Sequence, residues 1–263
     1  MTTTGALSGL KVVDLTRVLA GPWSTQILAD LGAQVIKVEA PDKGDDTRHW
    51  GPPWVKDTDG DDTDESAYFQ CANRGKKSVR IDFTSDTELD QVKKLITNAD
   101  ILVENFKVGT TQKFGLDYES LAKLNPKLIY CSITGFGQTG PYAERPGYDF
   151  IIQAMAGLMS ITGEQDGKPG AGPQKVGVAL SDVMTGLYAT IGILAAVNER
   201  HTSGKGQYID LALFDVTAAA LANQASNFLV GGQIPERLGN AHPNIVPYQT
   251  FMTADRPLVV AIG

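Results

Sequence analysis

The sequence contains few cysteines and histidines. Its two cysteines are Cys71 and Cys131, and its three histidines are His49, His201 and His242. The cysteines form no CxxC pair, and no two histidines have the spacing that places them on one face of a helix. This pattern argues against a disulfide framework and against a zinc site. We expect both cysteines to be buried free thiols and the protein to be cytoplasmic, in a reducing compartment.

The chain has no excess of positive charge, and we expect neither a leader nor a long apolar run. Lys and Arg together number 23 against 30 Asp and Glu, for a net charge of −7. The basic residues form no stripe, which argues against a nucleic-acid partner. The first residues lack the basic and apolar segments of a signal peptide, and no apolar run is expected to reach the length of a membrane span. We expect a soluble protein without a membrane partner.

Strand-like and helix-like segments alternate along most of the chain. The predicted strands are 10–16, 33–39, 78–83, 101–104, 128–134 and 208–213. The predicted helices between them are 23–31, 86–98, 118–124 and 183–198. This alternation predicts a doubly wound, mostly parallel, Rossmann-like α/β sheet. Ligands in such sheets bind beyond the carboxyl ends of the strands.

The pattern changes after residue 215. We predict a large α/β domain over 1–215, a helix and linker over 216–245, with helical spacing at 215–229, and the start of a smaller domain over 246–263. The last predicted strand, 257–263, reaches the end of the sequence without a cap or partner. We therefore expect the small domain to be incomplete and the chain to be truncated.

Asp182 stands between a strand-like run, 176–180, and the predicted helix 183–198. A carboxylate in that place meets unpaired backbone N–H groups and the positive end of the helix dipole. Asp is among the best N-cap residues, so a structural cap explains it. The same setting keeps a carboxylate ionised and able to attack an electrophile. Local pattern alone leaves both roles open.

Two loops resemble ligand-binding motifs only in part. The segment 135–140 matches G-x-G-x-x-G after a strand, but prolines follow it and no helix is expected before about Phe150. A glycine-lined loop that lets backbone approach another ligand fits better. The acidic segment 57–65 has its glycine at the wrong place for a calcium loop, so a solvated loop is expected.

Two small basic groups stand near the ends of predicted strands. Arg74, Lys76 and Lys77 precede the strand 78–83, and Lys107 and Lys113 follow the strand 101–104. Solvated edges and phosphate contacts are both compatible with them. Arg17 and Arg48, in turn, are either surface arginines or partners for a second carboxylate on a substrate.

Short segments in a characteristic order extend over nearly the whole chain. They are LSGLKVVDLT (7–16), AGP (20–22), LGAQVIKVE (31–39), NRGKKS (73–78), VENF (103–106), NPKLIY (125–130), GFG (135–137), GYDF (147–150), TSGKG (202–206) and RLGN (237–240). Together they resemble the class III CoA-transferases, the family that includes formyl-CoA transferase and carnitine CoA-transferase. The match covers about the N-terminal two-thirds of a typical member.

The resemblance implies a reaction and a site. Asp182 matches the family's nucleophile, which forms an aspartyl acyl anhydride and then an aspartyl–CoA thioester while CoA moves from an acyl-CoA to a carboxylic acid. Coenzyme A is then a substrate, and no prosthetic group or metal is implied. The matching CoA or active-site positions are Arg74, Lys76, Asn105, Phe106, Lys107, Lys113 and Tyr148. The family also implies an interlocked homodimer.

The same superfamily contains α-methylacyl-CoA racemases, which pair an aspartate with a histidine in a Gly-His-Asp motif. This chain has Tyr148 in that place, so one of the two bases that racemisation needs is missing. Transferase chemistry is therefore favoured over a racemase or epimerase. An inactive CoA-binding fragment is the non-enzymatic alternative. His242 is either part of a lid over 239–244 or an anchor for that loop.

Overall fold

The computed structural model describes residues 5–263, and their contacts group into two units. Unit 1 comprises Met1–Gly147 and Asp182–Leu213, and unit 2 comprises Tyr148–Ser181 and Phe214–Gly263. The consecutive ranges predicted from the sequence did not anticipate this interleaving, since 148–181 groups with the C-terminal part. The predicted domain boundaries themselves stay a prediction.

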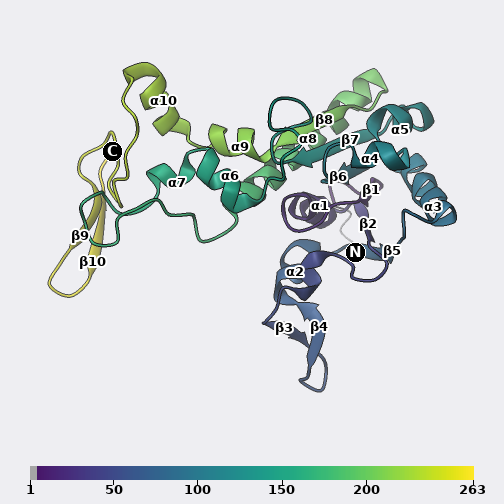
Figure 1. Ribbon diagram of the computed structural model, residues 1–263, viewed down its shortest axis with the longest axis horizontal. Coiled ribbons are helices and arrows are strands. Elements are labelled where there is room, and N and C mark those ends of the chain that lie inside the picture. Colours follow the sequence, from purple (N-terminus) through teal and green to yellow (C-terminus); the bar gives the residue numbers. More distant parts are fainter. Residues whose placement is uncertain (1–4) are drawn as a thin grey trace. The chain divides into compact units, whose positions relative to one another are not determined.

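Unit 1 is built on a six-stranded parallel sheet (Figure 1). Across the sheet the strands are β5 (Lys77–Arg80), β2 (Gln34–Glu39), β1 (Lys11–Asp14), β6 (Ile101–Glu104), β7 (Ile129–Thr134) and β8 (Tyr208–Ala212). The chain starts at β1, moves outward to β2 and β5, and then returns to the other side of β1. This is the doubly wound strand order, and its switch point lies between β1 and β6. The predicted fold class is confirmed.

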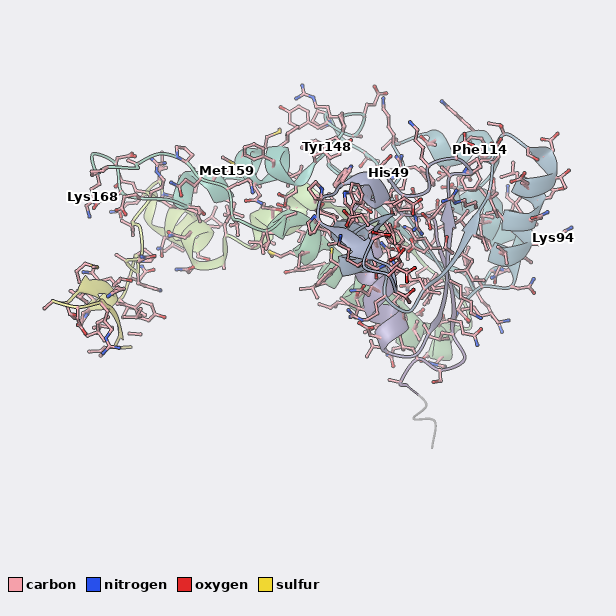
Figure 2. All side chains as sticks on the ribbon, turned by 90° about the horizontal axis from the view of Figure 1, so that it is seen from below. His49, Lys94, Phe114, Tyr148, Met159 and Lys168 are labelled. Atoms are coloured by element: carbon pink, nitrogen blue, oxygen red, sulfur yellow. The ribbon has the colours of Figure 1, made fainter. Side chains whose placement is uncertain are left out.

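Helices connect these parallel strands, as a crossover connection requires. They are α1 (Ala20–Asp30), α2 (Ala67–Asn73), α3 (Asp86–Thr97), α4 (Thr110–Phe114), α5 (Tyr118–Leu124) and α8 (Leu180–Ser203). The helix α3 shows why the sequence pattern worked: Val92 and Ile96 are fully buried in the core, whereas Lys94 projects to solvent (Figure 2). Ser85 caps this helix by accepting from the Glu88 backbone N–H.

The acidic segment 57–65 is part of a hairpin and not only a loop. The strand β3 (Trp54–Lys56) pairs antiparallel with β4 (Asp62–Ser66), and a short 3-10 helix, η1 (Asp46–His49), precedes them. At the hairpin tip the Asp57 carboxylate accepts from the backbone N–H groups of Asp59 and Asp61. The loop is thus closed by its own aspartate.

Unit 2 holds the remaining elements. They are α6 (Asp149–Met155), α7 (Leu158–Ile161), α9 (Leu213–Ala219, of which Leu213 belongs to unit 1), α10 (Ala222–Gly231), β9 (Tyr248–Met252) and β10 (Pro257–Ala261). The predicted single helix over 215–229 is wrong, because Ala222 has a φ of +44° and interrupts it. The predicted final strand is confirmed as β10, which pairs antiparallel with β9.

The predicted strand over 176–180 does not form. The backbone N–H of Val176 donates to the side chain of Gln153, and the N–H of Leu180 donates to the Val178 carbonyl. These backbone groups are satisfied by a side chain and by a turn, so no neighbouring strand is needed. The helix α8 consequently begins at Leu180, earlier than expected.

The helix α8 is also longer and more apolar than expected. By length and composition alone it could cross a membrane, with a window of mean hydropathy 1.6, so the expectation that no run reaches that length is wrong. A core helix passes the same test, and 44% of that window is buried. Within unit 1 the helix packs on α1, where the Ser24 and Thr190 hydroxyls lie 3.0 Å apart.

The two cysteines differ in exposure. Cys131 is buried in β7, as expected, and its burial raises the pKa of its thiol. Cys71 on α2 is exposed, so the expectation of two buried thiols is wrong for this residue. Neither forms a disulfide.

Candidate functional site

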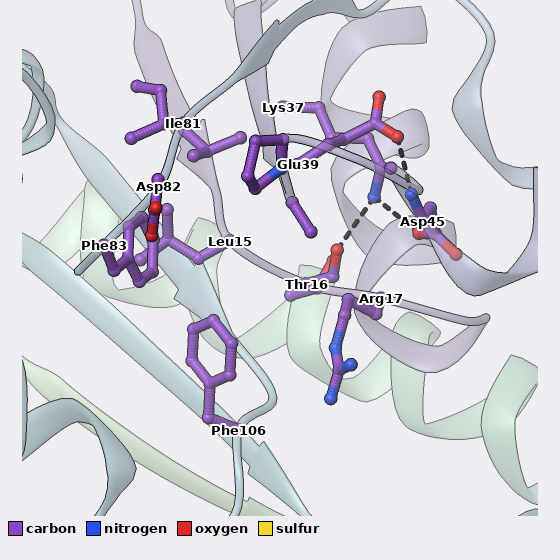
Figure 3. A pocket seen from close by; sticks show the side chains of 14 residues that line it. Leu15, Thr16, Arg17, Lys37, Glu39, Asp45, Ile81, Asp82, Phe83 and Phe106 are labelled. Carbon is purple, nitrogen blue, oxygen red and sulfur yellow. Dashed lines mark hydrogen bonds and ion pairs between the residues drawn. The ribbon is translucent and has the colours of Figure 1, made fainter. Parts of the chain in front are cut away.

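A cavity of about 290 Å³ lies at the carboxyl ends of the strands, at the switch point of the sheet. Its lining comes from the end of β2 and from the segments that follow β1, β2, β5 and β6 (Figure 3). The side chains that define it are Arg17, Lys37, Glu39, Asp45, Phe83 and Phe106. This is the place where the fold predicts a ligand.

A buried ion pair forms part of the cavity wall. The ammonium of Lys37 lies 2.8 Å from the Asp45 carboxylate and donates to the Thr16 carbonyl at 2.8 Å (Figure 3). Both charged side chains are almost completely buried. Removing one partner of such a pair leaves an uncompensated buried charge, which strongly destabilises a fold. Lys37 and Asp45 therefore hold the loops after β1 and β2 in place.

Glu39 reinforces the same wall. Its carboxylate accepts from the Asp45 backbone N–H at 2.7 Å and from two guanidinium nitrogens of Arg48 at 2.8 Å each. Burial alone raises the pKa of Glu39, but the hydrogen bonds from Arg48 and Ser78 outweigh it and lower the pKa to about 2. Arg48 also pairs with Glu65 at 3.0 Å. The Arg48 guanidinium thus uses three of its five N–H donors on two protein carboxylates, and its role toward a substrate carboxylate stays a prediction.

Aromatic rings and an arginine form the opposite wall. The rings of Phe83 and Phe106 pack edge to face with their centres 6.2 Å apart. The Arg17 guanidinium carbon lies 6.0 Å from the centre of the Phe106 ring. Arg17 is half exposed and pairs with Asp46 at 3.4 Å. An aromatic face beside a cation suits a nucleobase with a phosphate nearby.

Asn105 joins the two loops at the switch point. Its amide oxygen accepts from the Arg17 backbone N–H at 2.9 Å, and its amide nitrogen donates to the Arg17 carbonyl at 2.8 Å. The predicted CoA contacts Asn105 and Phe106 thus meet at the cavity, with Phe106 in its lining and Asn105 shaping the loop. Lys107 and Lys113 follow on the same connection, and both are exposed.

The other two basic residues predicted to contact CoA, Lys76 and Arg74, form interactions within the protein. The side chain of Lys76 is buried, and its ammonium donates to the Asp14 carboxylate, the Pro22 carbonyl and the Asn73 side chain at 2.9–3.0 Å. An ammonium has three donors, so all are occupied. Arg74 is exposed and pairs with Asp30 on α1. Neither lines the cavity, and Lys76 has a structural role where a nucleotide contact was predicted.

Asp182 lies in the first turn of α8 and is half-buried. Because the helix begins at Leu180, Asp182 is inside the first turn and is not its N-cap. A carboxylate there is still favoured by the helix dipole. One turn later, a Cβ built on Gly186 would lie 2.7 Å from the Ala20 carbonyl. Residues four apart share a helix face, so Asp182 lies on the face of α8 that meets the start of α1, directly after the cavity loop that carries Arg17.

Tyr148 belongs to unit 2, where it is the N-cap residue of α6 and is 63% exposed. Tyr148 directly follows Gly147 in the chain. A Cβ built on Gly135 would lie 2.5 Å from the Gly147 Cα. The first glycine of the loop 135–140 therefore allows the backbone of Gly147 to approach closely, whereas the approach of a ligand to this loop stays a prediction.

His242 anchors the loop 239–244. Its Nδ1 accepts from the backbone N–H groups of Asn244 and Ile245 at 3.0 and 3.1 Å, and its own backbone N–H donates to the Tyr248 carbonyl. Of the two roles left open by the sequence, the structure supports the loop anchor. Within residues 5–263 no group of three or more His, Cys, Asp or Glu side chains is arranged to hold a metal ion. The expectation that no metal is needed stays a prediction.

Several cavity residues were not anticipated from the sequence. Lys37 and Glu39 alternate with apolar residues at the end of β2, and both are buried. Charged residues inside a buried strand of a parallel sheet are the signal that could have identified them. Asp45 and Phe83 carry no comparable signal, because their roles depend on loops that meet only in the folded chain.

The profile of CoA-transferase family III matches residues 7–263. The chain belongs to this family. A succinate–glutarate CoA-transferase from Agrobacterium fabrum is 56% identical over 98% of the chain and 63% of its own length, and a succinyl-CoA:glutarate CoA-transferase from Mus musculus is 48% identical over 98% and 56%. The crystal structure of a CaiB/BaiF family protein from Brucella suis is 55% identical, with a TM-score of 0.91, over 99% of this chain and 67% of that one. The chain thus spans about six-tenths of the length of these curated relatives.

Proposed function

We propose that this chain forms the nucleophile-bearing, CoA-binding part of an enzyme that moves CoA between an acyl-CoA and a dicarboxylic acid. The observation that carries the proposal is the family match over residues 7–263. The position of Asp182 in the first turn of α8 supports its proposed role as the nucleophile. Two relatives that are 48–56% identical are named for succinate or succinyl-CoA and glutarate. These names support a dicarboxylic acceptor.

The proposed reaction proceeds through Asp182 in two half-reactions. A carboxylate oxygen of Asp182 attacks the thioester carbon of the donor, the C–S bond breaks, and CoA leaves as a thiolate. The thiolate attacks the Asp182 carbonyl of the resulting anhydride, which releases the donor acid and leaves CoA as an aspartyl thioester. The acceptor carboxylate attacks that thioester and again releases the thiolate. The thiolate then takes the acceptor's acyl group and restores the Asp182 carboxylate.

The cavity is the proposed site of the adenosine end of CoA. The adenine would stack on Phe106, and the phosphates would lie toward Arg17, Lys107 and Lys113, of which the lysines are exposed. The rest of the CoA molecule would follow the loop from Arg17 to the start of α1, against which the Asp182 face of α8 packs. We further propose a cytoplasmic homodimer as the working form of the whole protein.

Transfer of CoA from succinyl-CoA to glutarate tests this proposal. The protein should form glutaryl-CoA, and Asp182→Asn should abolish its formation by removing the anionic nucleophile. Asp86→Asn is the matched control, since Asp86 is an exposed carboxylate in the first turn of α3. Exchange of the α-proton of a 2-methylacyl-CoA with deuterated water, without CoA transfer, would instead support a racemase. Binding of CoA with neither reaction would support an inactive CoA-binding protein.

A further inference from the structure

The side chains of Asp149 and Gln153 hold the backbone that leads into Asp182. They lie one turn apart on α6, and the Gln153 amide nitrogen donates to the Asp149 carboxylate at 2.8 Å. The other carboxylate oxygen of Asp149 accepts from the backbone N–H of Ser181 at 2.8 Å. The Gln153 amide oxygen accepts from the backbone N–H of Val176 at 2.9 Å. All four residues belong to unit 2, and Gln153 is fully buried.

A second buried contact holds the same point of the chain. The hydroxyl of Thr217 on α9 donates to the hydroxyl of Ser181 at 2.8 Å, and both residues are fully buried. Ser181 is therefore held at its backbone by Asp149 and at its side chain by Thr217. Its peptide bond connects it directly to Asp182.

The segment 176–179 enters α8 without strand or helix geometry. The segment before the helix forms no strand, and Gly177 adds backbone freedom between Val176 and Val178. The first N–H groups of a helix have no partner inside the helix, and Asp149 supplies one for Ser181. Positional errors of about 1 Å at a reacting group are enough to slow an enzyme about a hundredfold.

We propose that Asp149 and Gln153 are positioning residues for the nucleophile, with Thr217 as a third support. The inference rests on the proposed function, because it assumes that Asp182 is the reacting group. Neither residue lines the cavity at the strand ends, so CoA affinity should not depend on them. Their loss should lower kcat while the dissociation constant of CoA changes little.

Because the Gln153 amide donates to the Asp149 carboxylate, exchanging the amide and the carboxylate between the two positions tests the proposal. Asp149→Asn alone directs an amide nitrogen at the Gln153 amide nitrogen, and Gln153→Glu alone directs a carboxylate at the Asp149 carboxylate. In the double variant the amide introduced at position 149 accepts from the Ser181 N–H and donates to the carboxylate introduced at position 153. That carboxylate still accepts from the Val176 N–H. Each single variant should lower kcat at least about tenfold, and the double variant should recover to within about threefold of the wild type.

Measurements beside kcat separate positioning from general instability. Amide hydrogen exchange at Val176 and Ser181 should accelerate in the single variants and return to the wild-type rate in the double variant, at unchanged CoA affinity. Thr217→Val, with Thr217→Ser as its control, probes the second support if a single variant does not fold. Unchanged kcat in folded single variants, or a double variant slower than either single one, would overturn the inference. If the wild type transfers no CoA, the proposed function fails first and this inference with it.

Discussion

Asn105 is fixed to the backbone of Arg17 by two hydrogen bonds, one donated in each direction, at 2.9 and 2.8 Å. The two residues are far apart in sequence but follow β6 and β1, the neighbouring strands on either side of the switch point. The side chain thereby joins the two loops that carry Arg17 and Phe106 at the edge of the cavity. We therefore expect Asn105 to affect a ligand in the cavity through these loops.

Asn105→Ala should weaken CoA binding without unfolding the protein. Two hydrogen bonds are lost, each contributing about 0.5–1.5 kcal/mol, and the loops that carry Arg17 and Phe106 become mobile. We expect the dissociation constant of CoA, measured by calorimetry, to rise about tenfold. Asn98→Ala is the control, because Asn98 ends α3 and lies outside the cavity. A change of less than about twofold in Asn105→Ala would contradict the assigned role.

Phe106→Ala should lower CoA affinity through loss of base stacking. Stacking of a base on an aromatic side chain contributes about 1–3 kcal/mol, so the dissociation constant should rise by roughly five- to a hundredfold. Phe114→Ala is the matched control, since the ring of Phe114 packs on Phe83 at 5.6 Å but does not line the cavity. Equal losses for the two variants would mean that Phe106 acts only by packing.

Lys76→Met should affect stability more than ligand binding. The substitution leaves the Asp14 carboxylate buried with one cation fewer, and breaking a buried pair costs about 3–5 kcal/mol. Lys77→Met, at the exposed neighbouring position, should change stability by less than about 0.5 kcal/mol. Chemical denaturation measures both. If Lys76→Met is as stable as the wild type but binds CoA weakly, Lys76 is a nucleotide contact after all.

Glu104 should make the stability of the protein depend on pH. It is buried at the end of β6, and its carboxylate accepts from the Phe106 backbone N–H at 2.8 Å. Burial, with a smaller contribution from Asp210, raises the pKa of Glu104 from its ordinary value of 4.5 to about 7, against the hydrogen bonds from Ser132 and Phe106. Between these two values the folded state holds a proton that the unfolded state has lost, so the free energy of unfolding falls as the pH rises.

The raised pKa of Glu104 also sets how much the free energy of unfolding should change with pH. The loss attributable to Glu104 should reach about 3 kcal/mol between pH 4.5 and pH 7. Glu104→Gln should remove that dependence and become more stable than the wild type at about pH 8, whereas Glu119→Gln at an exposed position should not. Parallel denaturation curves for wild type and Glu104→Gln at every pH would show that the carboxyl is not perturbed.

The sheet and its helices could be predicted because their pattern is local. The strand β6 begins with three consecutive apolar residues, and the spacing of Val92 and Ile96 in α3 matches one helix face. The strand predicted over 176–180 had a similar composition, yet Gln153 satisfies its backbone from another helix. No local sequence pattern predicts the contact between Gln153 and the Val176 backbone. Tertiary hydrogen bonding decided the conformation of this segment.

The candidate site was predictable only where it depends on position relative to the strands. Phe106 follows β6, and the fold brings it to the cavity as expected. Lys76 follows no such rule, because its role is set by the burial of Asp14 on a strand 62 residues earlier. A lysine in a basic cluster looks solvated from sequence alone. Its three protein acceptors appear only in the folded chain.

The formation of a covalent intermediate on Asp182 is the most direct test of the whole account. The protein would be incubated with succinyl-CoA and then with hydroxylamine, which converts an activated aspartyl group into a hydroxamate. Peptide mass spectrometry should find the hydroxamate on Asp182, only when succinyl-CoA is present, and in the Asp86→Asn control as in the wild type. A hydroxamate on another carboxylate, or none during active CoA transfer, would contradict the assignment of Asp182 as the nucleophile.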